Sequence, residues 1–282
     1  LLMSIIVNQW GDGREKINDS LDAINSEYDF SIPKDIFLRG CLFMTGLSLV
    51  FKVDNFEQKN IAIIKNNFDE IVKYIKSACR IFNEFGYNRN NLRSNLIILP
   101  LAKYMYRNKI NDIDIINKRR VLRWIQLSIV NRVFGSQTTN YLTRLRTIID
   151  NSVKDFPLDK IKQESALMER NMDISEELLE DIIEKAQYGS QDSWSLLTLL
   201  QNNLAFEDKE FHEGKKNKQK QDKLPEEWIQ MYCKSIGITE QEYKEKHFIP
   251  QIELTAENFD QYIRDRKILL KNALLAKLKA DF

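Results

Sequence analysis

The feature that most constrains the fold is a helical repeat of apolar residues over positions 60–85. Apolar side chains recur there at spacings of three and four residues, at Ile61, Ile64, Phe68, Ile71, Val72, Ile75, Ala78, Cys79 and Phe82. This spacing places them on one face of a helix, with lysines and acids on the other face. Gly86 follows where helices commonly end in a left-handed residue. We predict a long helix that buries this stripe in a core, in preference to a partner-binding groove.

Helical periodicity continues through most of the chain, and the residues that interrupt helices are scarce. Only 9 glycines and 5 prolines occur among 282 residues. A hydrophobic content of 43% and a charged content of 29% are typical of a soluble globular protein. We therefore predict a mainly α protein, with a multi-helix domain over residues 16–205 and a small C-terminal domain over residues 206–282.

Local signals predict where several helices begin and which side chains they bury. Thr239 with Glu242, and Asp173 with Glu176, have the spacing of a capping box. Pro100 interrupts an apolar run and either begins a helix or kinks one. In the last helix we expect five apolar side chains to face inward, namely Phe259, Ile263, Leu270, Leu274 and Leu278.

Charge and cysteine content exclude several functional classes. The formal net charge is +1, so any contact with DNA has to come from a local patch. The 3 cysteines are widely spaced and form no Cys-x-x-Cys pair, which argues against a zinc site or a disulfide framework and favours a reducing cytoplasm. The most apolar run, residues 41–51, is too short to span a bilayer, so no membrane partner is expected.

An arginine-rich stretch over residues 119–146 is a candidate nucleic-acid interface. It contains Arg119, Arg120, Arg123, Arg132, Arg144 and Arg146. A planar guanidinium group can bond phosphate through two donors, and Arg119 and Arg120 are the candidates we select for DNA contact. The alternative is a solvated face, or ion pairs with an acidic helix farther along the chain.

Residues 211–282 contain short phrases in a fixed order. Phe211-His212 is followed by Asn217 and Lys220, then Leu-Pro-Glu-Glu-Trp at 224–228, His-Phe-Ile-Pro at 247–250 and Arg-Lys at 266–267. In these phrases the stretch resembles the C-terminal HNH nuclease domain of GmrSD-type (type IV, modification-dependent) restriction proteins. Residues 16–205 resemble the helical region of the same family in pattern and in short phrases, among them Arg-x-x-Arg-Trp at 120–124.

The resemblance implies part of a metal-dependent HNH DNA endonuclease, a hydrolase used in the restriction of foreign DNA and hence in phage defence. It implies an HNH-like ββα core in residues 206–282, DNA as the partner, and a divalent metal ion, Mg²⁺, as the cofactor. Self-association or another defence protein are further implied partners. A nucleotide would bind through an N-terminal half of which residues 1–15 are the end, and the opening Leu1-Leu2-Met3 leads us to expect a fragment.

Site residues also follow from the resemblance. Asn217 matches the asparagine at the metal-proximal end of the motif's helix, and Lys220 would contact phosphate. His212 matches the residue just before the family's Asp-His pair, a pair that this sequence lacks, whereas His247 lies outside the motif and is interpreted as structural. Neighbouring lysines are further candidates for phosphate contact, namely Lys215, Lys216 and Lys218. A lysine run can equally be a solvated loop.

The spacing between His212 and Asn217 leaves two interpretations open. Only four residues separate them, whereas a hairpin needs two strands of several residues each and a turn. Either the segment is a shrunken, inactive relative, or these two residues border an HNH core that the sequence omits, which is the interpretation we favour. With an inactive remnant, the alternative function is a helical interaction or DNA-binding adaptor.

Overall fold

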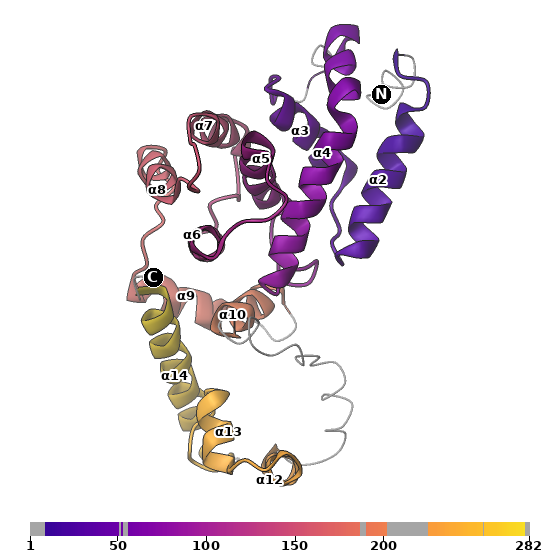
Figure 1. Cartoon of the computed structure of the whole chain (residues 1–282). Coiled ribbons are helices and arrows are strands. Elements are labelled where there is room, and N and C mark those ends of the chain that lie inside the picture. Colours follow the sequence, from indigo (N-terminus) through magenta and orange to yellow (C-terminus); the bar gives the residue numbers. More distant parts are fainter. Residues whose placement is uncertain are drawn as a thin grey trace. The chain divides into compact units, whose positions relative to one another are not determined.

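The computed structural model describes residues 9–50, 52, 56–186, 190–201, 225–255 and 257–279. Every regular element in these ranges is a helix, and none of them is a strand (Figure 1). This confirms the prediction of a mainly α protein, whereas the ββα core is not seen in these ranges. None of the helices described is both long enough and apolar enough to cross a membrane.

The helices belong to two compact units, each with its own packing. The boundary expected at residues 205 and 206 falls outside the described ranges and stays a prediction. The second unit contains α9 and α12 to α14, and the first contains α2 to α8 together with most of α10. The elements of the first unit are α2 (Gly13–Glu27), α3 (Lys34–Thr45), α4 (Gln58–Glu84), η2 (Asn95–Ile97), α5 (Ile98–Asn108), α6 (Ile115–Val130), α7 (Thr138–Asp150), α8 (Leu158–Leu167) and α10 (Gln191–Gln201).

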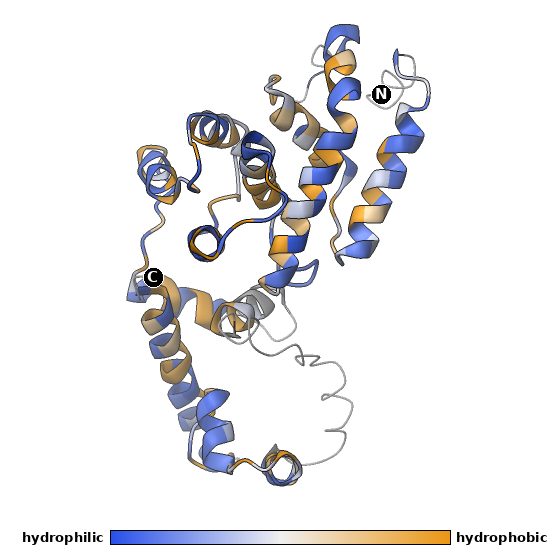
Figure 2. Cartoon of the chain, in the orientation of Figure 1, coloured by the Kyte–Doolittle hydropathy of each residue, from blue (hydrophilic) through white to orange (hydrophobic). Residues whose placement is uncertain are grey.

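Helix α4 is the long helix that the apolar repeat predicts. Of the nine stripe residues, all but the half-buried Val72 are buried, which confirms the core interpretation. Figure 2 shows both apolar and polar residues along α4, as expected of an amphipathic helix. Gly86 follows the helix with a φ of 82°, in the left-handed region that glycine adopts without strain.

Helix α5 lies at the centre of the first unit and packs against α3, α4 and α7. Pro100 is its third residue, so this proline begins a helix and does not kink one. Lys103 is buried with the apolar residues of α5, and its Nζ lies 3.0 Å from the Met44 carbonyl oxygen and 3.0 Å from Asp150 Oδ1. The ammonium group is tolerated there because it is both hydrogen-bonded and paired.

An aromatic cluster joins α6 to the segments that follow α6 and α7. The ring of Trp124, which is fully buried, lies 6.1 Å from that of Phe134 and 5.3 Å from that of Phe156. Asn117 also binds this segment, because its Oδ1 accepts the backbone N–H of Phe156 at 2.7 Å. Asp114 caps the same helix by accepting the backbone N–H of Asn117 at 2.8 Å.

The second unit contains α9 (Glu176–Lys185), α12 (Pro225–Ile236), α13 (Glu240–Lys246) and α14 (Phe259–Lys279). Helix α9 packs against α14, and two lysines of α14 pair with acids of α9. Lys267 Nζ lies 2.6 Å from Glu184, and Lys271 Nζ lies 2.6 Å from Glu180. Leu274 and Leu278 are buried as expected, but Phe259 is 51% exposed and Tyr262 takes the buried position in the first turn.

The two predicted capping boxes have different outcomes. Thr239 and Glu242 form a complete box at the start of α13, with both reciprocal hydrogen bonds present. The prediction for Asp173 is wrong, because Ser175 caps α9 and its hydroxyl oxygen accepts the N–H of Leu178 at 3.1 Å. The helix begins two residues later than the spacing of Asp173 and Glu176 predicts. Ser175 is the residue with extended backbone directly before the helix, so its hydroxyl reaches a free N–H group of the first turn.

Candidate functional site

The residues that the resemblance selects for catalysis lie outside the part of the chain that the structure describes. These are His212 and Asn217, together with the candidate phosphate contacts Lys215, Lys216, Lys218 and Lys220. Within the described ranges, no group of three or more His, Cys, Asp or Glu side chains could hold a metal ion.

Some arginines of the arginine-rich stretch make contacts that stabilise the fold, and others are exposed on α6 and α7. Arg119 is exposed, whereas Arg120 is half-buried, with its Nη1 3.4 Å from the Phe156 carbonyl oxygen. Arg146 donates from Nη1 to the Leu47 carbonyl oxygen at 2.6 Å, and burial lowers the pKa of its guanidinium. Arg144 pairs with Glu164 of α8 at 3.6 Å, so the ion-pair alternative holds for this residue.

Two of the phrases that carry the resemblance meet in one apolar core of the second unit. Trp228 of Leu-Pro-Glu-Glu-Trp is buried with Ile229, Cys233 and Tyr243, and Ile249 of His-Phe-Ile-Pro packs against this cluster. The ring of His247 lies 4.2 Å from that of Tyr243. His247 is thus part of the aromatic packing, in agreement with its structural interpretation.

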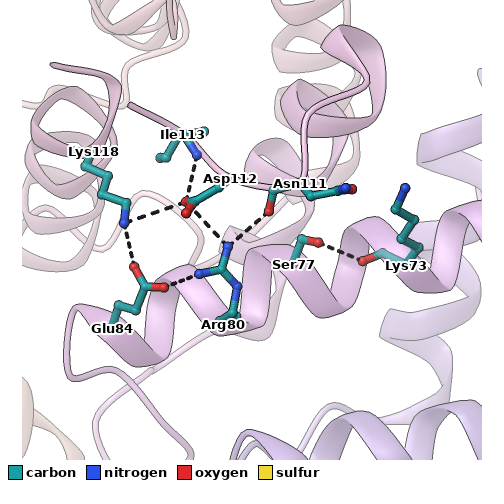
Figure 3. Close-up of polar contacts among 8 residues, drawn as sticks. All are labelled: Lys73, Ser77, Arg80, Glu84, Asn111, Asp112, Ile113 and Lys118. Carbon is teal, nitrogen blue, oxygen red and sulfur yellow. Dashed lines mark hydrogen bonds and ion pairs between the residues drawn. The ribbon is translucent and has the colours of Figure 1, made fainter. Parts of the chain in front are cut away.

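A ring of four charged residues joins α4 to the loop before α6 and to α6 itself (Figure 3). Arg80 pairs with Glu84 along α4 and with Asp112 of the loop at 3.4 Å. Lys118 of α6 closes the ring, with its Nζ 2.8 Å from Glu84 and 3.6 Å from Asp112. Two cations face two anions, so the ring is electrically balanced and holds the loop in place. The contact between Glu84 and Lys118 joins residues 34 positions apart, and helical periodicity gave no signal for it.

This ring predicts a specific acid sensitivity. Partial burial alone would raise the pKa of Asp112, but the Ile113 N–H and the charges of Lys118 and Arg80 lower it below its ordinary value. Because the pKa of Asp112 is lower in the folded state than its ordinary value of 3.8, the ionised carboxylate stabilises the fold at pH values above 3.8. This stabilisation is lost as the pH falls through the lowered pKa. We expect Asp112→Asn to make the melting temperature fall less steeply from about pH 5 to about pH 2.

The matched control for this prediction is Asp19→Asn, which removes an exposed carboxylate of α2 outside the ring. Melting temperatures are measured by circular dichroism across the pH series for parent and both variants. Equal acid slopes for the parent and Asp112→Asn would show that the ring contributes no stability of its own.

A pocket of about 490 Å³ in the first unit is a feature that the sequence did not indicate. Two chain segments form it, one before α5 and one at the end of α6 and in the turn that follows. Its lining residues are Leu92, Arg93, Ser94, Leu96, Ile97, Ser128, Ile129, Arg132, Phe134 and Gly135. We call it the Arg93/Arg132 pocket. Because its two segments are far apart in sequence, only the tertiary fold brings Arg93 and Arg132 into one lining.

No family model matches the sequence, and no curated protein matches it. The resemblance to GmrSD-type proteins therefore rests on the phrases quoted above and on the pattern of the helical region.

Proposed function

We propose that the chain is part of a metal-dependent HNH DNA endonuclease of the GmrSD-like type, which restricts foreign DNA such as that of phages. The observation that carries this proposal is the ordered series of phrases from Phe211 to Lys267. Trp228 and Ile249, which belong to two of these phrases, pack in one core of the second unit.

The roles within this proposal follow the resemblance residue by residue. Asn217 would lie near the metal ion, Lys220 would contact the phosphate, and His212 would precede the Asp-His pair, which this sequence lacks. The cofactor is a divalent ion such as Mg²⁺, which in phosphodiester hydrolysis stabilises charge on the reacting oxygens. The neighbouring lysines and Arg119 add sequence-independent attraction for the DNA backbone.

The direct test is cleavage of DNA by the whole protein. Supercoiled plasmid and phage DNA, each modified and unmodified, are incubated with the protein and Mg²⁺, and products are separated on agarose. We expect nicked or linear DNA with Mg²⁺ and none with a chelator. Cleavage that survives chelation, or an inert protein on all substrates, would contradict the nuclease proposal.

One observation favours the second candidate, a helical DNA-binding or interaction adaptor. The four residues between His212 and Asn217 cannot hold a hairpin, and a chain contiguous there would have lost its HNH core. Such a protein would bind DNA without cutting it. The two candidates share DNA as a partner, so binding alone does not separate them, whereas cleavage does.

For either candidate, we expect DNA binding to weaken when Arg119 and Arg120 are both changed to alanine. Each lost phosphate contact should make the plot of log affinity against log salt shallower by about 0.9. The salt series is measured by fluorescence anisotropy. The matched control replaces Arg14 and Arg89, which are exposed elsewhere in the first unit. An unchanged salt slope with intact helical content would show that these arginines are only solvated or paired.

A further inference from the structure

We propose that the Arg93/Arg132 pocket binds a small organic anion, with its carboxylate or phosphate at the arginines and an apolar body in the pocket floor. The lining combines two guanidinium groups with the buried apolar side chains of Leu96, Ile97 and Phe134. None of its described lining residues carries a carboxylate. Arg93 and Arg132 are therefore the only charged side chains among the described lining residues.

The size and donor content of the pocket suit such a ligand. A volume of about 490 Å³ lies within the range of about 300–1,000 Å³ that is typical of small-molecule sites. Arg93 and Arg132 are exposed and each has other interactions within the chain. A guanidinium carries five N–H donors, so it can hold an anion and keep an internal partner. The Ser94 hydroxyl adds a further donor group to the lining.

One wall of the pocket is held in position before any ligand arrives. The turn after α6 is closed by a hydrogen bond from the Gly135 N–H to the Arg132 carbonyl oxygen at 3.0 Å. The guanidinium of Arg170 donates to the carbonyl oxygens of Val133, Ser136 and Gln137 and lies 5.2 Å from the ring centre of Tyr141. A wall fixed in this way loses little conformational entropy on binding.

Arg132 itself has an unfavourable backbone conformation. Its φ is 51°, in the left-handed region that asparagine tolerates better than arginine does. Lys109, Lys154 and Glu169 adopt the same left-handed conformation elsewhere in the chain, so the backbone angle alone does not assign a ligand to Arg132. Beside it, the Ser128 hydroxyl is buried and has no hydrogen-bond partner among the described residues. This hydroxyl in the lining offers a bound ligand a hydrogen-bonding group.

The experiment measures ligand binding to the whole protein by isothermal titration calorimetry. Two probes distinguish the source of the anion: adenosine monophosphate carries phosphate on an aromatic body, and octanoate carries carboxylate on an aliphatic one. Inorganic phosphate tests the anion alone, and 1-octanol tests the body alone. We expect either adenosine monophosphate or octanoate to bind more tightly than inorganic phosphate and 1-octanol do.

Two variants assign that binding to the pocket. Arg132→Asn and Arg93→Gln should each weaken it about 10-fold or more, because each removes hydrogen bonds to a charged group. Arg89→Gln, on the same loop as Arg93 but outside the lining, should leave binding unchanged. Arg132→Asn should also keep or raise the melting temperature, since it relieves the left-handed backbone, and a purely structural role would not give that combination.

The proposal is overturned if neither anion binds, or if the anion that binds has the same affinity for the parent and for both arginine variants. If Arg132→Asn proves unstable, the comparison of Arg93→Gln with Arg89→Gln decides alone. The outcome is independent of nuclease activity, because the readout is heat of binding and no DNA is present.

Discussion

Asn217→Ala should reduce metal-dependent nicking of DNA by a factor of about 100, the upper end of the loss seen when a supporting residue of a metal site is removed. The resemblance implies that this asparagine would lie at the metal-proximal end of the motif's helix, so its loss would weaken the proposed site for the ion. DNA binding should change little, since the amide carries no charge. The measurement is the initial rate of conversion of supercoiled to nicked plasmid at the Mg²⁺ concentration that half-saturates the parent protein.

The matched control is Asn140→Ala, which removes an exposed asparagine of α7. It should nick at the parent rate. Raising the Mg²⁺ concentration should restore part of the activity of Asn217→Ala if the defect is metal affinity. An Asn217→Ala protein that nicks at the parent rate would remove this residue from the site and leave the order of the phrases as the remaining support.

Trp124→Ala should lower the free energy of unfolding of the first unit by about 3–5 kcal/mol, the range for deleting a large aromatic side chain from a core. The ring is fully buried and touches Phe134 and Phe156, which lie on two different segments. Its removal leaves a cavity that both segments border. For a unit of this size the melting temperature should fall by about 10 °C.

Urea unfolding followed by far-ultraviolet circular dichroism measures this loss. Ile115→Ala is the matched control, because Ile115 lies on the same helix but is 59% exposed, and its effect should stay within about 0.5 kcal/mol. A loss below about 1 kcal/mol for Trp124→Ala would mean that the two neighbouring segments collapse into the space left by the ring. The pocket that Phe134 lines would then also be expected to change shape.

Local signals of the sequence were sufficient for several elements. The stripe over 60–85 predicted α4, and Gly86 predicted its end, because period and backbone freedom are properties of neighbouring residues. Thr239 and Glu242 predicted the start of α13 for the same reason. The prediction that Phe259 faces inward was wrong, since a periodic pattern does not specify whether other segments cover the end of a helix.

The candidate nuclease residues were selected from sequence phrases alone, and their geometry stays a prediction. What the tertiary structure added lies elsewhere in the chain. It showed that Arg146 and Arg120 contact backbone carbonyl groups, whereas the sequence pattern treats all arginines of the stretch alike. The arginines of the stretch differ in solvent exposure and in their contact partners, and neither property follows from the neighbouring residues in the sequence.

The sequence by itself determined the helical class, the position of α4 and the phrases on which the proposed function rests. The tertiary structure alone decided the charge ring of Arg80, Glu84, Asp112 and Lys118, the burial of Lys103 and the Arg93/Arg132 pocket. The physical reason is the range of the interactions. Helical period and capping act within one or two turns, whereas these contacts join segments tens of residues apart and exist only once the core has brought those segments together.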